Sequence, residues 1–156
     1  MNPAYPGPMQ TVKLFASSIK LGMPESLLFP GEKSDFKTLN QAYSYVGFEL
    51  LGSRRFTPNA YTLRNCFGQD TLNETDRQAN IGSTLLNWQF EASNDMLKWT
   101  ILDKRIHYPE HHIQRSPASL QVQGLVRRGA VSTWGIDLTK LGDWERSEGF
   151  KYFRIV

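Results

Sequence analysis

Short segments in which apolar and polar residues alternate recur along the chain, and they restrict its fold more than any other feature. In the segment 45–51, Val46, Phe48 and Leu50 share one face, as in a half-buried strand. The segments are rich in aromatic and β-branched residues and are bounded by Gly, Pro, Asn, Asp or Ser. Strands are predicted in this way at 11–17, 45–51, 60–65, 87–93, 98–103, 119–125, 131–138 and 150–156.

Convincing helical periodicity is absent from the sequence. Segment 70–82 could form a short helix, but it lacks the apolar stripe with which a helix packs against a sheet. About eight short strands joined by long polar connections are typical of an antiparallel sandwich or jelly roll. The sequence therefore predicts an all-β protein.

Two tryptophans, Trp88 and Trp99, lie on either side of the polar run Ser93-Asn94-Asp95 and predict a β-hairpin. Asn94 and Asp95 suit its turn because their side chains bond to nearby backbone and tolerate left-handed geometry. Trp99 is expected to share an apolar strand face with Ile101, and large aromatic side chains on such faces anchor a core. The predicted core residues are Trp88, Phe90, Trp99 and Phe153.

The length of 156 residues fits one domain with a sizeable core. Residues 1–10 contain three prolines and a glycine, and they predict an extended N-terminal arm. The β-sandwich domain is therefore expected to span residues 11–156.

Charge and cysteine content limit the classes of partner and compartment. The net charge of +3 comes from scattered basic residues and short doublets, whereas a nucleic-acid-binding surface should be denser in positive charge. Cys66 is the single cysteine, so an internal disulfide is excluded and a reducing compartment is favoured. No secretory signal and no apolar run long enough for a membrane span is present. These features predict an intracellular protein, located in the cytoplasm, that does not bind nucleic acid.

No motif for catalysis or for cofactor binding is found. The three histidines gather at 107–112 with Glu110, but Pro109 disfavours a helix that would align His107 and His111 on a metal. A phosphate-binding loop and a nucleophile elbow are both missing. Ser17 and Ser18 follow a strand, where their hydroxyls are expected to bond to backbone. The sequence predicts a non-enzymatic protein without a metal or cofactor.

Four pieces of sequence follow one another in an order that is more specific than any single piece. They are "FASSIKLGMPESLL", "GFELLGSRRFTPNAYTLRN", "LLNWQFEASNDMLKWTILD" and "FKYFRIV". In this order they resemble the discoidin or coagulation-factor type C domain, and in particular the intracellular versions attached to BTB and HECT-type ubiquitin-ligase proteins. The resemblance implies a galactose-binding-like jelly roll of eight strands, without catalytic activity. It also implies that ligands bind to loops at one end of the sandwich, carried here by 20–25, 31–40 and 65–83.

We therefore expect a binding module that mediates protein–protein contact within a larger intracellular protein or assembly. The alternative is a carbohydrate-binding module that uses the same end loops, with an aromatic platform formed by Phe67 beside Arg64 or by Tyr108 beside His111. Function on this fold depends on loops, which the fold itself does not dictate. The residues expected to contact a ligand or partner are Leu21, Met23, Arg64, Phe67, Asp70, Arg77, Tyr108 and His111.

Membrane binding is a third hypothesis and the least favoured one. Members of the resembled family that bind membranes carry exposed aromatic or leucine side chains on the first loop. Here that loop offers Leu21 and Met23 without an aromatic pair. We therefore expect no membrane contact.

The C-terminal segment 150–156 raises a separate expectation. Phe150, Tyr152 and Arg154 alternate there with Lys151, Phe153 and Ile155, whereas members of the resembled family continue into a closing strand. If 150–156 is an edge strand, its backbone needs a partner. The expectation is that the natural chain continues beyond 156 or that a neighbouring subunit supplies the strand, which favours a role inside an assembly.

Overall fold

A computed structural model describes residues 11–28, 36–39, 41–65, 85, 87–106 and 131–156 of the chain. Two short 3-10 helices, η2 (Pro24–Leu28) and η4 (Leu138–Lys140), and one helix, α2 (Asp143–Glu148), accompany the strands in these residues. The strands are β1 (Val12–Ala16), β2 (Val46–Leu50), β3 (Ala60–Arg64), β4 (Trp88–Ser93), β5 (Thr100–Arg105), β6 (Val131–Gly135) and β7 (Tyr152–Ile155).

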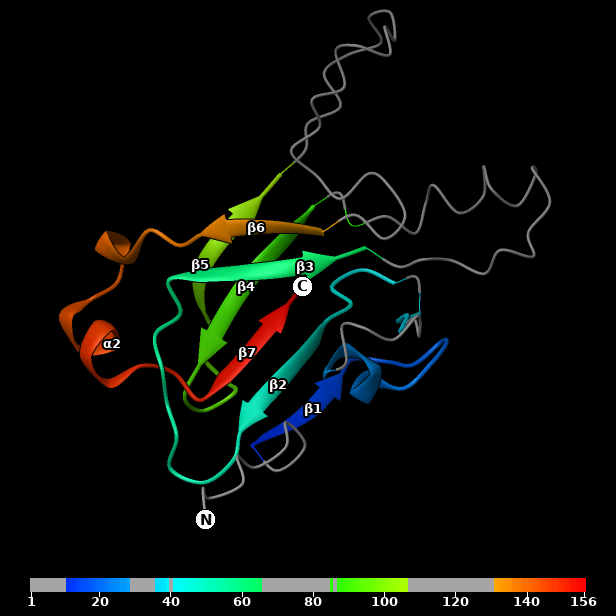
Figure 1. The fold of residues 1–156 in the computed structure, drawn as a ribbon, viewed down its shortest axis with the longest axis horizontal. Coiled ribbons are helices and arrows are strands. Elements are labelled where there is room, and N and C mark those ends of the chain that lie inside the picture. Colours follow the sequence, from blue (N-terminus) through cyan, green and yellow to red (C-terminus); the bar gives the residue numbers. More distant parts are fainter. Residues whose placement is uncertain (1–10, 29–35, 40, 66–84, 86, 107–130) are drawn as a thin grey trace, which may run out of the picture.

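The strands form two antiparallel sheets, as the alternating sequence pattern predicts. A five-stranded sheet has the order β1-β2-β7-β4-β5, and a two-stranded sheet pairs β3 with β6. Figure 1 shows β3 and β6 crossing in front of the larger sheet. The protein is therefore an all-β sandwich. The strand predicted at 119–125 and the short helix considered at 70–82 lie outside the described residues.

Strand β7 is a central strand, which corrects the expectation that 150–156 forms an open edge. Its residues pair with β2 on one side, for example Phe153 with Phe48, and with β4 on the other, for example Phe153 with Ala92. Both backbone edges of β7 are thus occupied by this chain. The argument for an assembly that rested on an unpaired last strand is removed.

The core lies between the two sheets and is dominated by aromatic side chains. Phe153 is fully buried, and its ring lies 5.0 Å from that of Phe48 and 4.7 Å from that of Phe56. A second cluster packs Trp88 against Trp134, with ring centroids 5.0 Å apart. The predicted core positions Trp88, Phe90 and Phe153 are confirmed.

Trp99 does not lie in the core, and this part of the prediction is wrong. Trp99 is half-buried and Ile101 is 50% exposed, whereas the next residue, Leu102, is buried. The register of β4 against β5 shifts at this point, so that Leu102 is an extra residue in β5. Such a bulge turns the strand locally, and here Asp103 follows Leu102 on the inner face. Ile101 pairs with Glu91, whose side chain lies on the outer face, so the face shared by Trp99 and Ile101 is the outer one.

The outer face of the larger sheet carries a layer of aromatic and charged side chains around Arg154. The Arg154 guanidinium lies 3.9 Å from the ring centroid of Trp99 and 5.2 Å from that of Tyr45. Its Nε donates to Glu91 at 2.7 Å, and Glu91 is buried although it lies on this outer face. Trp99 thus stacks on a paired arginine and shields the buried carboxylate from water.

The connections between strands leave the sandwich at two opposite ends. Strands β1, β3 and β5 end, and strands β2, β4 and β6 begin, at the same end, where Ala16 pairs with Val46 and Arg64 pairs with Val131. We call it the long-loop end. The short-turn end carries the β2–β3 and β4–β5 connections together with α2 (Figure 1). The loops assigned to ligand binding by family resemblance all start from the long-loop end.

Candidate functional site

The β1–β2 connection at the long-loop end is fixed by backbone and side-chain hydrogen bonds. Lys20 N donates to Lys37 O at 2.8 Å, and Lys37 N donates to Leu21 O at 2.9 Å. The Ser18 hydroxyl accepts from Leu39 N at 3.0 Å, and the Ser17 hydroxyl accepts from Tyr45 N at 3.0 Å. The predicted role of both serines in binding backbone is confirmed. The described segments of the connection are therefore held to one another and to the start of β2.

Five aliphatic side chains of this connection are exposed to solvent. Met23 is the most exposed at 70%, and it lies beside η2, where Ser26 Oγ donates to Met23 O. The backbone bridge between Leu21 and Lys37 joins the two segments that carry the five side chains. Clusters of exposed apolar side chains on loops mark interaction surfaces more often than single ones do. We define the aliphatic patch as Ile19, Leu21, Met23, Leu27 and Leu39.

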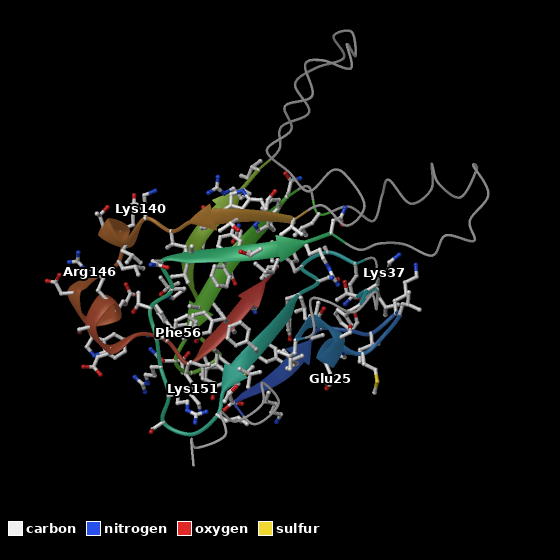
Figure 2. All side chains as sticks on the ribbon, viewed as in Figure 1. Glu25, Lys37, Phe56, Lys140, Arg146 and Lys151 are labelled. Atoms are coloured by element: carbon white, nitrogen blue, oxygen red, sulfur yellow. The ribbon has the colours of Figure 1, made fainter. Side chains whose placement is uncertain are left out.

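Charged groups surround the aliphatic patch without forming an ion pair among the described residues. Lys20 is exposed, while Lys37 and Glu25 are partly buried. Figure 2 shows Glu25 and Lys37 at this end of the molecule. An apolar centre with charged residues at its rim is the usual composition of a protein-binding surface.

Tyr43 is the most exposed aromatic side chain of this end among the described residues, at 87%. Its backbone has φ 58°, in the left-handed region that a tyrosine rarely adopts. The neighbouring Ser44 hydroxyl donates to Leu39 O and to Gln41 O, each at 2.9 Å, and holds the turn. The ring therefore projects from a turn whose backbone is fixed.

A hydrogen-bond network at the same end links the two sheets. Trp88 Nε1 donates to the Tyr61 hydroxyl at 2.9 Å, and that hydroxyl donates to Asp103 Oδ2 at 2.7 Å. Arg105 Nε donates to the same carboxylate oxygen at 2.7 Å. Burial, reinforced by Asp103, raises the pKa of Tyr61 to about 12. Tyr61 thus keeps its proton at neutral pH and acts as a cross-link between sheets.

The raised pKa of Tyr61 predicts a loss of stability at high pH. Since the native pKa of about 12 exceeds the ordinary value of 10.0, native Tyr61 retains its proton better than unfolded Tyr61 does. Its contribution to stability is complete below pH 10.0 and is lost as the pH rises toward about 12. Absorbance at about 295 nm, compared between the protein and Tyr61→Phe, should show one phenol titrating near pH 12. A difference curve centred near pH 10 would contradict the network.

The residues predicted from sequence to contact a ligand are only partly described. Leu21 and Met23 lie together in the aliphatic patch, whereas Arg64 is partly buried at the end of β3. Both predicted aromatic platforms include undescribed residues. Those outside the described residues are Phe67, Asp70, Arg77, Tyr108 and His111.

Sequence reasoning missed Ile19, Leu27, Leu39 and Tyr43. A usable signal existed for Ile19, because it follows a predicted strand in the same short loop as Leu21. Leu27, Leu39 and Tyr43 could not be assigned from the sequence. Only the backbone bridge between Leu21 and Lys37 shows that two segments distant in the sequence lie together.

Metal ligands do not gather in the part of the chain that the structure describes, where no group of three or more His, Cys, Asp or Glu could hold an ion. The three histidines lie at 107–112, outside that part. Within the same described ranges, no helix has the length and apolar character needed to cross a membrane.

Two comparisons with known proteins found no match for this chain. No protein-family model matches it, and no curated protein matches it either.

Proposed function

We propose that this protein is a non-catalytic binding module that contacts a protein partner through the aliphatic patch. The observation that carries the proposal is the exposure of five aliphatic side chains on a hydrogen-bonded connection, with Met23 at 70% and Ile19 at 59%. Burial of such side chains in an interface contributes about 25 cal/mol per Å² of apolar surface. The module acts within a larger intracellular protein or assembly.

The chemistry of the aliphatic patch favours a protein over a small polar ligand. Aliphatic side chains offer no directional hydrogen bonds, so they recognise shape and apolar surface. The cations at the rim, Lys20 and Lys37, can pair with carboxylates of a partner. The described segments of the connection are held by hydrogen bonds, so they lose little conformational entropy on binding. An apolar protein surface with acidic residues at its edge fits this patch.

Resemblance to the discoidin or coagulation-factor type C domain is consistent with this proposal. In the antiparallel sandwich, β1, β3 and β5 end on the side where β2, β4 and β6 begin, and this shared end supports the proposal that neighbouring loops act together in binding. We extend the proposal to the fold family on this basis: the domain is a galactose-binding-like jelly roll that uses its long-loop end for binding.

Substitution of Met23 by aspartate tests the proposed surface. A photo-crosslinking residue at Leu27 would capture the partner in cells, and binding would then be measured with both proteins purified. We expect Met23→Asp to weaken the affinity at least tenfold, which corresponds to about 1.4 kcal/mol, because the interface would bury a charge. Isothermal titration calorimetry gives the affinity.

The matched control is Ile101→Asp, which places the same charge at a similarly exposed aliphatic position on the outer face of β5. This variant should bind the partner as the unsubstituted protein does. Equal affinity of Met23→Asp and Ile101→Asp for the crosslinked partner would refute the patch as the binding surface.

Carbohydrate binding is the second candidate, and the exposed ring of Tyr43 is the observation that favours it. Sugars stack on exposed aromatic rings held in fixed positions, and the Tyr43 turn is fixed by Ser44. A glycan array probed with the protein and with Tyr43→Ala would distinguish carbohydrate binding from binding of a protein partner. Retention of a glycan by the protein and its loss in Tyr43→Ala would favour this candidate over a protein partner.

A further inference from the structure

One row of residues crosses all five strands of the larger sheet on its outer face, away from β3 and β6 (Figure 1). The strand register places side by side, from β1 to β5, Phe15, Gly47, Arg154, Glu91 and Ile101. A Cβ at Gly47 would lie 2.7 Å from the ring of Phe15, so this ring covers the glycine. The face is open to solvent at its β5 edge, where Ile101 is 50% exposed.

Aromatic rings surround Arg154 on this face. Tyr45, directly before β2, packs edge-on against Phe15 with ring centroids 6.2 Å apart. The Arg154 guanidinium contacts both Tyr45 and Trp99. Tyr152 lies on the same face as Arg154, because side chains two residues apart in a strand point to the same side. All four rings are half-buried, and we define the aromatic face as Phe15, Tyr45, Trp99 and Tyr152.

The charged side chains that the three central strands carry on this face are paired. Lys151 Nζ lies 2.9 Å from Glu49 Oε1, and Arg154 Nε lies 2.7 Å from Glu91 Oε2. One exposed lysine on each of the outermost strands, β1 and β5, adds positive charge at the two edges of the face. Because the four central charges satisfy one another, the centre of the face favours an uncharged ligand.

The size of the face limits what can cover it. Five strands at about 4.8 Å and strand lengths of about five residues at about 3.3 Å give a projected area of roughly 400 Å². A stable dimer buries about 800 Å² on each partner, so two copies stacked through this face would fall short. An extended segment of about ten residues, in contrast, can cross the face from edge to edge.

Residues 1–10, which lie outside the described residues, have a composition that suits the aromatic face. They contain Pro3, Pro6 and Pro8, and they contain no Asp, Glu, Lys or Arg. Proline has no N–H, so three prolines within six residues disfavour a further strand beside β2 and favour polyproline II geometry. Aromatic surfaces are the usual binding sites for such segments, because the extended backbone is preformed and the proline rings pack on aromatic rings.

The point of attachment also brings residues 1–10 to this face. Thr11 O accepts from Leu51 N at 2.9 Å, which fixes the end of the segment at the start of β1, at the short-turn end. Ten residues in polyproline II geometry span about 31 Å, whereas the four strand spacings from β1 to β5 amount to about 19 Å. The segment is therefore long enough to reach Trp99, which directly precedes β5.

We propose that the aromatic face is a docking surface for residues 1–10 of the same chain, which cross the outer face of the larger sheet from β1 to β5. The segment runs over Tyr152 to Trp99, and its proline rings pack on these two rings. Attachment to β1 makes the binding intramolecular, so a high effective concentration compensates for a small contact area. The proposal does not depend on the function proposed for the aliphatic patch.

Photo-crosslinking in the full chain tests the proposal. The variant Tyr5→p-benzoylphenylalanine places a photoreactive ketone in the segment, and trypsin then releases it in peptide 1–13. Illumination should join this peptide to peptide 99–104, which begins with Trp99, and to peptide 152–154, which begins with Tyr152. Mass spectrometry identifies the joined peptides. In an equal mixture of unlabelled and isotope-labelled protein, the links should form within one isotopic form only.

Further variants of the photoreactive chain show whether contact with the aromatic face, and not the short tether alone, produces the links. Trp99→Ala should lower the yield of the link to peptide 152–154 about fivefold, because the segment loses a large aromatic contact. The matched control Trp144→Ala removes a tryptophan that is 57% exposed on α2 and should leave this yield unchanged. Replacement of all three prolines of the segment by alanine should also lower the yield severalfold.

Several results would overturn the proposal. Links from peptide 1–13 that avoid both 99–104 and 152–154 would place the segment elsewhere. Equal yields in Trp99→Ala and Trp144→Ala, with near-ultraviolet circular dichroism showing that both are folded, would mean that the tether alone brings the groups together. Links between the two isotopic forms would show that the face receives the segment of a second molecule.

Discussion

Replacement of Trp88 by alanine is expected to lower the free energy of unfolding by about 3–5 kcal/mol, as for other large buried aromatic residues. Trp88 is only 3% exposed and packs edge-on against Trp134. Its removal also takes away the indole N–H that donates to the Tyr61 hydroxyl. Urea unfolding followed by far-ultraviolet circular dichroism measures the loss.

Two further variants show whether the loss arises from burial. Trp88→Phe keeps an aromatic ring but lacks the N–H donor, so its cost should be smaller and should report on the hydrogen bond to Tyr61. Trp99→Ala removes a tryptophan that is half-buried on the outer face and should cost less than Trp88→Ala. If Trp99→Ala were the more destabilising of the two, the assignment of inner and outer faces would be wrong.

Replacement of Phe153 by alanine is expected to have an effect of similar size, about 3–5 kcal/mol. Phe153 is 0% exposed and lies in β7, the middle strand of the larger sheet. Its ring contacts those of Phe48, Phe56 and Phe90, so a cavity at this position removes contacts on several sides. The same urea titration gives the change.

Phe153→Leu serves as the matched variant, because it retains most of the buried apolar volume. It should cost clearly less than Phe153→Ala. An alanine variant as stable as the unsubstituted protein would mean that the site collapses without penalty or that the ring is not packed as described.

The strand segments could be predicted because alternation is a local property of the sequence. In β2, Phe48 and Leu50 pack against the core as their spacing requires, and in β4 Trp88 and Phe90 do the same. The β4–β5 turn was predictable for a similar reason, since the side chain of Asp95 bonds backbone two and three residues away. The left-handed residue of that turn, however, is Met96 and neither Asn94 nor Asp95.

Pairing between distant strands could not be read from the alternation. The alternation in 150–156 correctly assigns Phe153 and Arg154 to opposite faces of the strand. It does not reveal that β7 lies between β2 and β4. The bulge at Leu102 is equally hidden, because one extra residue exchanges inner and outer positions without changing the local composition. Trp99 was assigned to the wrong face for a different reason: Trp99 and Ile101 are the more apolar pair, yet Leu102, on the opposite side of the strand, is the residue that is buried.

Helix α2 and the buried carboxylate of Glu91 were missed for related reasons. Six residues are too few to show an apolar stripe, and α2 is fixed by specific bonds such as Gly142 N to Glu145 Oε2. Glu91 is one of the polar positions of β4, yet Arg154 and Trp99 from distant segments cover it.

The candidate sites were predictable only in outline. Leu21 and Met23 attract attention because they are apolar residues in a predicted loop. Whether such side chains are buried or exposed depends on tertiary contacts. Here the backbone bridge between Leu21 and Lys37 fixes the loop, and Leu21 and Met23 are exposed.

The central position of β7 has a consequence for biosynthesis. The β1–β2 and β4–β5 hairpins share no edge with each other, and residues 152–155 alone join them into one sheet. A ribosome releases these residues after the other described strands, so the facing edges of β2 and β4 stay open until residues 152–155 are made. The larger sheet can therefore close only after residues 152–155 have been translated, and a chain interrupted before residue 152 exposes two strand edges to chaperones, proteases or other nascent chains.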